Sequence, residues 1–219
     1  AGGGGFVRVS NQRGHWRPSA SLRGDVHRIA WATRSFSNMD SGAILVAGAR
    51  SYPMVSGALG IKWVPNEKHM LGLNVTRGNR APGLSELLAT GNHFDSYREE
   101  QGDPDLGIET SHGIDFQWVK QPVDGQRWCG DVAAYASRIQ NYMLLVPTDE
   151  VNATGLPVQL HQATTATLKG VDVNVKWTPW GSDRWSTNVS ASYVDSRDGD
   201  GAVLPWTPPA TGRCEVQRA

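Results

Sequence analysis

Apolar and polar residues alternate in several short segments of this 219-residue chain. In the segment 71–75, two leucines and a valine are separated by Gly72 and Asn74, and the segment 171–175 carries valine at every second position. Successive side chains of a strand point to opposite faces of a sheet, so each segment predicts a strand with one apolar face. Many such segments, separated by Gly, Asn and Asp, predict an all-β chain.

The connections between the alternating segments are short at one end of the strands and long at the other. Short turns are predicted at 65–68, 122–125 and 180–183. Long polar loops are predicted at 77–109, 147–163 and 195–212. Barrels of the outer membrane have short periplasmic turns and long extracellular loops. The sequence therefore predicts an antiparallel transmembrane β-barrel.

Two regions lack a clear alternation, and the sequence predicts irregular backbone there. The Gly-rich start, residues 2–5, is interpreted as a flexible end, and a strand is expected only over 6–10. Residues 33–55 are interpreted as a loop whose apolar centre, 44–47, can extend a neighbouring strand.

Several tryptophans lie where the predicted strands meet the short turns. These are Trp63, Trp118, Trp177 and Trp185. Tryptophan is enriched at membrane–water interfaces, so this placement favours an aromatic girdle on the periplasmic side. The alternative is that these side chains fill the core of an ordinary β-sandwich.

The composition excludes some classes of function. The chain has 21 basic and 21 acidic side chains, whereas a nucleic-acid-binding domain would carry a basic excess. It lacks the Gly-x-Ser-x-Gly and His-Glu-x-x-His motifs of hydrolases and metalloproteases, so we expect neither an enzyme nor a resident cofactor. The two cysteines, Cys129 and Cys214, lie far apart, and two thiols alone predict no metal site.

The stretch 76–109 carries a longer motif, divided between the two ends of the first long loop. An Arg-Gly-x-Arg-Ala-Pro run follows one strand, and a Gly-Asp-Pro-x-Leu-x-x-Glu run precedes the next. This stretch resembles the barrels of the TonB-dependent receptors of the Gram-negative outer membrane, although Thr76 and Asn79 depart from the usual serine and aromatic residue. The matching residues are Arg77, Gly78, Arg80, Ala81, Pro82, Glu86, Leu87, Gly102, Asp103, Pro104, Leu106 and Glu109, with Gly170 at a later strand.

The resemblance implies active uptake of a scarce ligand across the outer membrane. In this family, a plug domain inside the barrel contacts the inner-membrane TonB complex, and lipid surrounds the barrel. Residues 1–219 contain no segment that we recognise as a plug, as a TonB-contacting segment or as the closing strand. They are therefore interpreted as part of one barrel domain, with roughly eight or nine of about 22 strands.

Four side chains in the long loops are candidate ligands for a transported metal ion or metal complex: His93, Asp95, Glu99 and His161. Imidazole nitrogen and carboxylate oxygen suit zinc or iron. The surrounding segments resemble the zinc-uptake receptors of the family. Arg80 and Glu86 are instead predicted to form a structural ion pair.

Other functions remain open on the sequence alone. An organic siderophore would use aromatic and arginine contacts, for which Phe94, Tyr97 and Arg98 are candidates. A passive porin-like barrel and a soluble carbohydrate-binding β-sandwich are the alternatives from other classes.

Overall fold

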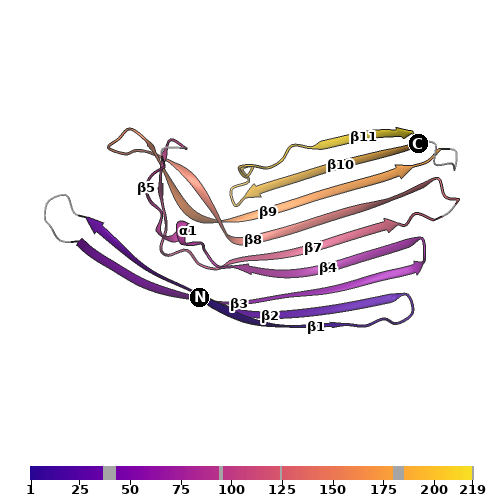
Figure 1. Ribbon diagram of the computed structural model, residues 1–219, viewed down its shortest axis with the longest axis horizontal. Helices are drawn as coiled ribbons and strands as arrows, with labels where there is room; N and C mark the ends of the chain where they lie inside the picture. Colours follow the sequence, from indigo (N-terminus) through magenta and orange to yellow (C-terminus); the bar gives the residue numbers. More distant parts are fainter. Residues whose placement is uncertain (37–42, 94–95, 124, 180–184, 219) are drawn as a thin grey trace.

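The computed structural model describes residues 1–36, 43–93, 96–123, 125–179 and 185–218, which form one 11-stranded sheet. Along the main path of the sheet, neighbouring strands are also neighbours along the chain, except that β7 follows β4 (Figure 1). The strands of this main path are β1 (Gly2–Ser10), β2 (Trp16–Phe36), β3 (Ala43–Asn66), β4 (His69–Arg80), β7 (Glu109–Lys120), β8 (Trp128–Val151), β9 (Pro157–Trp177), β10 (Trp185–Asp198) and β11 (Thr211–Arg218).

The connection from β4 to β7 contains the remaining elements. These are helix α1 (Leu84–Leu88) and the short strands β5 (Thr90–His93) and β6 (Arg98–Gln101). We call residues 81–108 the excursion. The described residues include no helix that is long and apolar enough to cross a membrane.

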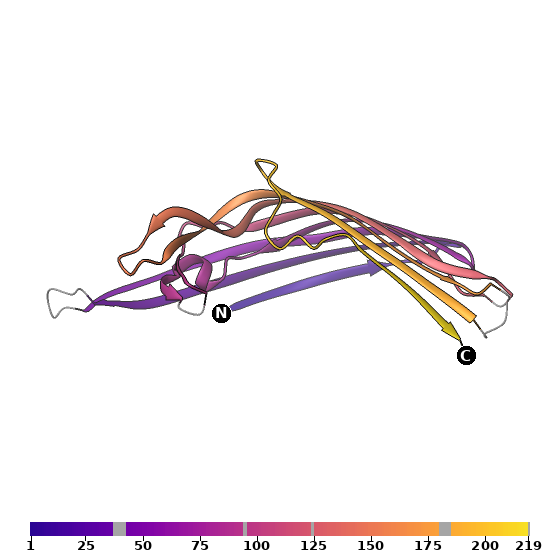
Figure 2. The same cartoon turned by 90° about the horizontal axis from the view of Figure 1, so that it is seen from above.

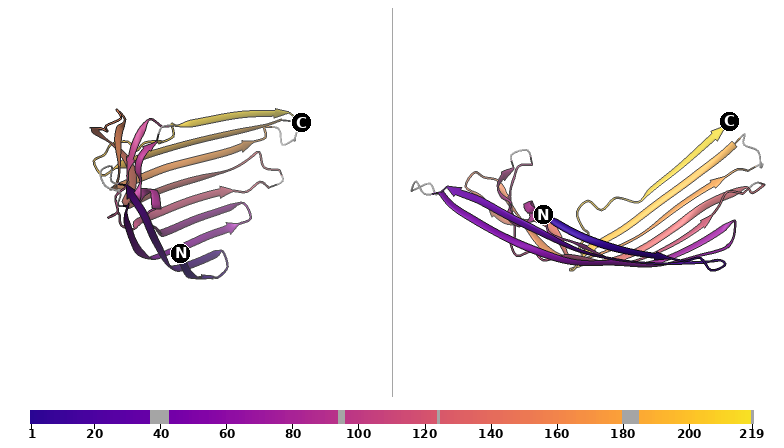
Figure 3. Two further views of the ribbon diagram at one scale, coloured as in Figure 1. Left: turned by 60° about the vertical axis from the view of Figure 1, so that its left-hand side comes forward. Right: turned by 60° about the horizontal axis from the view of Figure 1, so that its bottom comes forward.

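The sheet is bowed and open. Figures 2 and 3 show a curved strip with α1 on its concave side. Strands β1 and β11 form the two edges, and no pairing joins them in the described part of the chain. A curved antiparallel sheet of this kind confirms the prediction of a partial barrel. A β-sandwich would require two facing sheets, so that alternative is not the fold.

The two faces of the sheet differ in polarity. Leu87 of α1 packs against Tyr52 of β3, so the face that carries Tyr52 is the inward, concave one. On the opposite, outward face, Val75 is 51% exposed and lies beside Leu59 and Ile114 of the neighbouring strands. The predicted apolar positions all lie on this outward face: Leu71, Leu73, Val75, Val171, Val173 and Val175.

Tryptophans mark the short-turn end of the outward face. Trp63, Trp118, Trp177 and Trp185 lie at this end of their strands, as predicted, and Trp16 and Trp128 join them. The rings of Trp16 and Trp63 stack with centroids 5.7 Å apart. Lys120 Nζ lies 3.3 Å from the centroid of the Trp128 ring. The outward face therefore ends in a band of large aromatic side chains.

The strands are longer than the alternation predicted. Strand β2 runs to Phe36 and β3 begins at Ala43, so the prediction of a loop was wrong for 33–36 and 43–55, whereas 37–42 lie outside the described residues. Residues 147–163 are likewise mostly the ends of β8 and β9, which only 152–156 connect. The alternation fails here because paired backbone groups, rather than a continuous apolar face, hold these extensions together.

The Gly-rich start is not a flexible end but the first part of β1. Gly2 to Gly5 pair with His27 to Gly24 of β2 in register. Glycine disfavours strands because it has no side chain to pack. In this case the neighbouring strand supplies partners for the backbone groups, which composition alone does not reveal.

One glycine is required by a close contact between strands. Gly170 of β9 is the register partner of Tyr135 of β8. A Cβ atom at Gly170 would lie 2.3 Å from the Tyr135 ring, so any larger residue must displace that ring.

Elsewhere in the sheet, Cys129 and Cys214 are both free thiols.

Candidate ligand-capture site

The excursion is attached to the concave face by a small apolar core. Leu87 is 1% exposed and packs with Tyr52, Leu106 and Met143. Pro82, near the start of the excursion, is fully buried as well. Burying one leucine side chain stabilises a fold by about 1.5–3 kcal/mol. Helix α1 therefore cannot leave the sheet without a substantial loss of stability.

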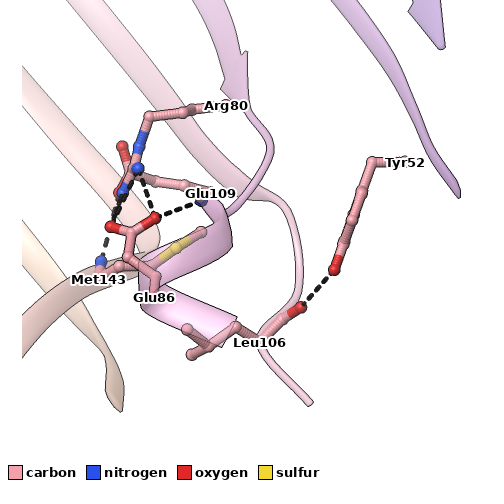
Figure 4. Close-up of polar contacts among 7 residues, drawn as sticks. Tyr52, Arg80, Glu86, Leu106, Glu109 and Met143 are labelled. Carbon is pink, nitrogen blue, oxygen red and sulfur yellow. Dashed lines mark hydrogen bonds and ion pairs between the residues drawn. The ribbon is translucent and has the colours of Figure 1, made fainter. Parts of the chain in front are cut away.

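Arg80, the last residue of β4, contacts two carboxylates (Figure 4). Its Nη1 lies 2.9 Å from Glu86 Oε2, and its Nη2 lies 3.0 Å from Glu109 Oε2. Glu109 Oε2 also accepts a hydrogen bond of 3.2 Å from the Met143 N–H. The predicted Arg80–Glu86 ion pair is confirmed, and it extends to Glu109 beyond the far end of the excursion.

The pKa of Glu86 lies below its usual value. Burial alone would raise it, but hydrogen bonds from Arg80 and from the Gly83 N–H outweigh the burial and lower it. The Gly83 N–H donates to Glu86 Oε2 at 2.6 Å. The carboxylate thus accepts a hydrogen bond from one of the amide groups that the start of a helix leaves without a backbone partner. The charged carboxylate therefore connects the first turn of the helix to the end of β4.

The Gly-Asp-Pro turn closes the far side of α1. The N–H groups of Gly102 and Asp103 donate to the carbonyls of Ala89 and Glu86 at 2.7 and 2.9 Å. These bonds satisfy carbonyl groups that a helix end leaves without partners. A Cβ atom at Gly102 would lie 2.5 Å from the Leu88 nitrogen, so only glycine fits at this position.

Two contacts fasten this turn to β3. The Arg50 guanidinium donates to the Pro104 carbonyl, and the Tyr52 hydroxyl donates to the Leu106 carbonyl at 3.5 Å (Figure 4). Ala81 packs against the same apolar core. These residues of the recognised motif thus hold the excursion in place rather than presenting groups to a ligand.

Two further motif residues lie within β4. A Cβ atom at Gly78 would lie 2.8 Å from Ser111 Oγ on β7, so a larger residue would require the Ser111 side chain to move. Arg77 is exposed on the outward face of the sheet, away from the excursion. Arg77 is therefore a motif residue that takes part neither in the apolar core nor in the ion pairs of the excursion.

Strand β6 brings the excursion against the hairpin formed by β8 and β9. Glu99, Glu100 and Gln101 pair in parallel with residues 158–160 of β9. Strand β5 completes this edge by pairing antiparallel with β6. Residues from two predicted loops consequently lie side by side at the long-connection end of the sheet (Figure 1).

Glu100 lies between two histidines at this junction. Glu100 Oε2 is 3.8 Å from His93 Nε2 and 3.8 Å from His161 Nε2, and Arg98 Nη2 is 2.6 Å from Glu100 Oε1. The side chains of Glu100 and His161 are 14% and 13% exposed, whereas that of His93 is half exposed. The buried His161 Nε2 has no hydrogen-bond partner among the described residues. The three side chains form what we call the His–Glu cluster.

The sequence identified both histidines of this cluster but missed Glu100. Adjacent side chains of a strand point in opposite directions, so only one of Glu99 and Glu100 can face the histidines. Asp95 lies outside the described residues. Within the described ranges, no group of three His, Cys, Asp or Glu side chains has the arrangement of a metal site.

Glu99 belongs to a different set of contacts. Asn152 Nδ2 donates to Glu99 Oε2 at 2.8 Å and to Asn92 Oδ1 at 2.7 Å. The pKa of Glu99 is lowered by the hydrogen bonds from Asn152 and Gln101. This carboxylate therefore ties β6 to the turn between β8 and β9, a structural role that the sequence did not predict.

Two aromatic side chains project from the long connections. Tyr97 is 77% exposed and Trp206 is 98% exposed. Both residues have positive φ angles, 53° and 63°. Such backbone conformations are unfavourable for large residues and are concentrated at functional sites. Tyr97 was predicted from the sequence as a ligand contact, whereas Trp206 was not, because only its position in a long loop distinguishes it.

The chain was compared with known proteins. Residues 3–216 match the family described as TonB dependent receptor-like, beta-barrel. The structure of the copper transporter OprC matches with a TM-score of 0.77 at 16% identity, covering 98% of this chain and 32% of OprC. The ferric yersiniabactin uptake receptor FyuA from Yersinia pestis matches with a TM-score of 0.69 at 11% identity, covering 98% of this chain and 30% of FyuA.

A third structure, the ferric-catecholate import receptor Fiu from K12 E. coli, matches with a TM-score of 0.66 at 15% identity, covering 97% of this chain and 31% of Fiu. No curated protein sequence matches. At these identities the structural similarity shows the fold, and the chain spans about a third of the length of the matched structures. The match over residues 3–216 shows that the chain belongs to the TonB-dependent receptor family and forms part of its β-barrel.

Proposed function

We propose that the complete protein lies in the outer membrane of a Gram-negative bacterium and imports a scarce ligand with energy supplied through TonB. Family membership supports this proposal. The outward apolar face and its terminal tryptophans also suit a barrel wall surrounded by lipid. The plug that contacts the TonB complex, and the remaining strands, are proposed to belong to parts of the protein outside residues 1–219.

The proposed ligand is a metal ion or a metal complex. The observation that carries this proposal is the His–Glu cluster, in which Glu100 lies 3.8 Å from both His93 and His161. Imidazole nitrogen and carboxylate oxygen are ligands that zinc and iron accept. Asp95, in the connection between β5 and β6, remains a candidate for an additional ligand.

Uptake of labelled zinc by cells that carry the complete receptor tests this proposal. His93→Ala plus His161→Ala should reduce TonB-dependent zinc uptake. The matched control is His15→Ala plus His27→Ala, which removes two histidines that lie outside the cluster and should leave uptake unchanged. Equal uptake in all three strains would reject the cluster as a zinc-capture site.

A siderophore is the second candidate ligand. Tyr97 and Trp206 project from two long connections, and such exposed aromatic side chains suit contacts with a large organic molecule. Phe94 was named for the same role but lies outside the described residues. TonB-dependent siderophore uptake that falls in Tyr97→Ala plus Trp206→Ala, with zinc uptake unaffected by the histidine changes, would support this alternative.

Dependence on TonB separates both candidates from a passive barrel. Active import requires the inner-membrane complex, so uptake should stop in cells that lack TonB. Continued uptake in those cells would instead support the porin-like alternative.

A further inference from the structure

Arg98 shares a carboxylate with the His–Glu cluster. Arg98 and Glu100 lie two residues apart on β6, so both side chains point to the same face of that strand. Arg98 Nε donates to Glu100 Oε1 at 2.7 Å, and Arg98 Nη2 lies 2.6 Å from the same oxygen. The two oxygens of Glu100 are therefore divided, with Oε1 toward the guanidinium and Oε2 toward His93 and His161.

The oxygen on the histidine side is placed for a single coordination bond. Zinc ligands lie about 2.0–2.2 Å from the ion, so two ligands of a tetrahedral site are about 3.4 Å apart. Glu100 Oε2 is 3.8 Å from Nε2 of each histidine, so a small contraction would bring these atoms to coordinating distance. While Arg98 holds Oε1, the carboxylate can bind an ion through Oε2 alone. Two imidazoles and one oxygen then leave a tetrahedral ion with an open fourth position.

Arginine side chains already pair with two carboxylates near the buried histidine of the cluster. Arg98, whose side chain is 33% exposed, is the partner of Glu100. Glu86 is a second carboxylate whose charge acts on His161, and it is paired with Arg80. A divalent cation bound by the His–Glu cluster would therefore lie close to a guanidinium that competes with it for Glu100.

Removing this guanidinium would have two opposite effects on cation binding. Arg98 fixes the rotamer of Glu100, so its loss frees a side chain that a bound ion must order again, which weakens binding. Arg98 also repels the ion. In water, unit charges about 4 Å apart change an equilibrium constant by a factor of about five, which becomes about 25 for a divalent ion. Because Glu100 is only 14% exposed, its neighbours still restrain it and the repulsion is stronger than in water, so the repulsion outweighs the restraint.

We propose that Arg98 sets the affinity of the His–Glu cluster for divalent cations, and that its guanidinium keeps the capture of such an ion weak and reversible. This inference rests on the metal-capture function proposed above. Imidazole and carboxylate ligands without a competing cation would hold zinc tightly, whereas an imported ion must leave the site again. Arg98 is therefore a specificity-determining residue that acts on the ion through Glu100.

Zinc binding to the purified complete receptor in detergent tests this inference, measured by isothermal titration calorimetry with the zinc ion alone as the ligand. Arg98→Gln and Arg98→Met both remove the charge and should tighten zinc binding roughly tenfold. Arg98→Lys keeps the charge and should bind zinc about as weakly as the wild type. The matched control is Arg23→Gln, since Arg23 forms a similar pair with Asp25 two residues along β2, and it should leave the zinc affinity unchanged.

The gain in affinity must arise at the cluster, so adding His93→Ala plus His161→Ala to Arg98→Gln should remove it. The inference is overturned if the two neutral variants bind zinc no more tightly than the wild type, because Arg98 would then only position Glu100. It is also overturned if Arg98→Lys tightens binding as much as they do. The proposed function fails separately, if zinc binding and zinc uptake by the otherwise unchanged receptor do not depend on the two histidines.

Discussion

A single guanidinium joins the two ends of the excursion, because Arg80 contacts both Glu86 and Glu109. Arg80→Ala would leave two mostly buried carboxylates without their cation, which is costly. Because Arg80 itself is partly exposed, we expect a loss of about 1–2 kcal/mol in the local stability of the excursion. Limited proteolysis of the complete receptor, followed by mass spectrometry, should show faster cleavage within 83–108.

The matched control is Arg23→Ala, which removes an exposed ion pair with Asp25. Exposed pairs contribute little, so this variant should leave the stability of the receptor nearly unchanged. If both variants were cleaved at the wild-type rate, the Arg80 contacts would not hold the excursion in place.

The contact between Gly170 and Tyr135 gives a second prediction at the level of residues. Gly170→Ala places a methyl group 2.3 Å from the Tyr135 ring and should destabilise the barrel by about 1–3 kcal/mol. In a Tyr135→Ala background the same change should be nearly neutral, because the ring is gone. Urea denaturation of the four proteins of this double-mutant cycle measures the coupling, and additive effects would contradict a direct clash.

Residue-level prediction succeeded where a motif related residues to one another. The Arg80–Glu86 pair could be predicted because both residues belong to one spaced pattern. The choice between Glu99 and Glu100 could not, since it depends on which face of β6 meets β9, and four-residue strands carry too little alternation to reveal this.

The attachment of helix α1 to the sheet depends on pH through Glu86. The pKa of Glu86 is lower in the folded chain than its usual value, so its contribution to stability is complete above a carboxyl pKa of about 4.3. The contribution is lost as the pH falls through that value and then through the lower folded pKa. The protection factors of the α1 amides, which correct for the slower intrinsic exchange at low pH, should therefore fall below about pH 4.

The comparison for this experiment is Glu86→Gln, which cannot ionise. The protection factors of the α1 amides in this variant should be lower than in the wild type at neutral pH and should change less on acidification. The same loss of protection in wild type and variant would assign the pH effect to other groups.

The extents of strands were harder to predict than their existence. The alternating segments of β4, β7, β9 and β10 identify strands with one apolar face. The ends of β2, β3 and β8, and the glycines of β1, continue as strands because neighbouring backbones supply hydrogen-bond partners. A single sequence contains no record of those partners.

For the whole molecule, the outward face is expected to contact lipid. Val173→Arg places a charge on that face and should cost roughly 2–4 kcal/mol near the middle of the bilayer. The control is Asn174→Arg, the next residue, which lies on the polar inward face near Asp131. Refolding of the complete receptor into lipid vesicles should fail or weaken only for Val173→Arg. Equal refolding of the two variants would argue against lipid on the outward face.

The open edges of the sheet give a further prediction. Strands β1 and β11 each leave one side without a partner in the described part of the chain. In hydrocarbon, each unpaired backbone group costs several kcal/mol. Residues 1–219 expressed alone should therefore aggregate rather than insert. A protease-resistant, heat-modifiable monomer in detergent would show instead that this part of the barrel is stable by itself.

The order of the strands also has a consequence for the rate of assembly. Most main-path strands pair with the next strand along the chain, and such contacts are fast because they close short loops. The pairing of β6 with β9 joins Glu99 to Val158 and spans a longer stretch of sequence than the hairpins do. It should therefore be among the last to form. His93 and His161 would then meet only after the strands from β7 to β9 have paired, so the His–Glu cluster is completed later than the part of the sheet beside it.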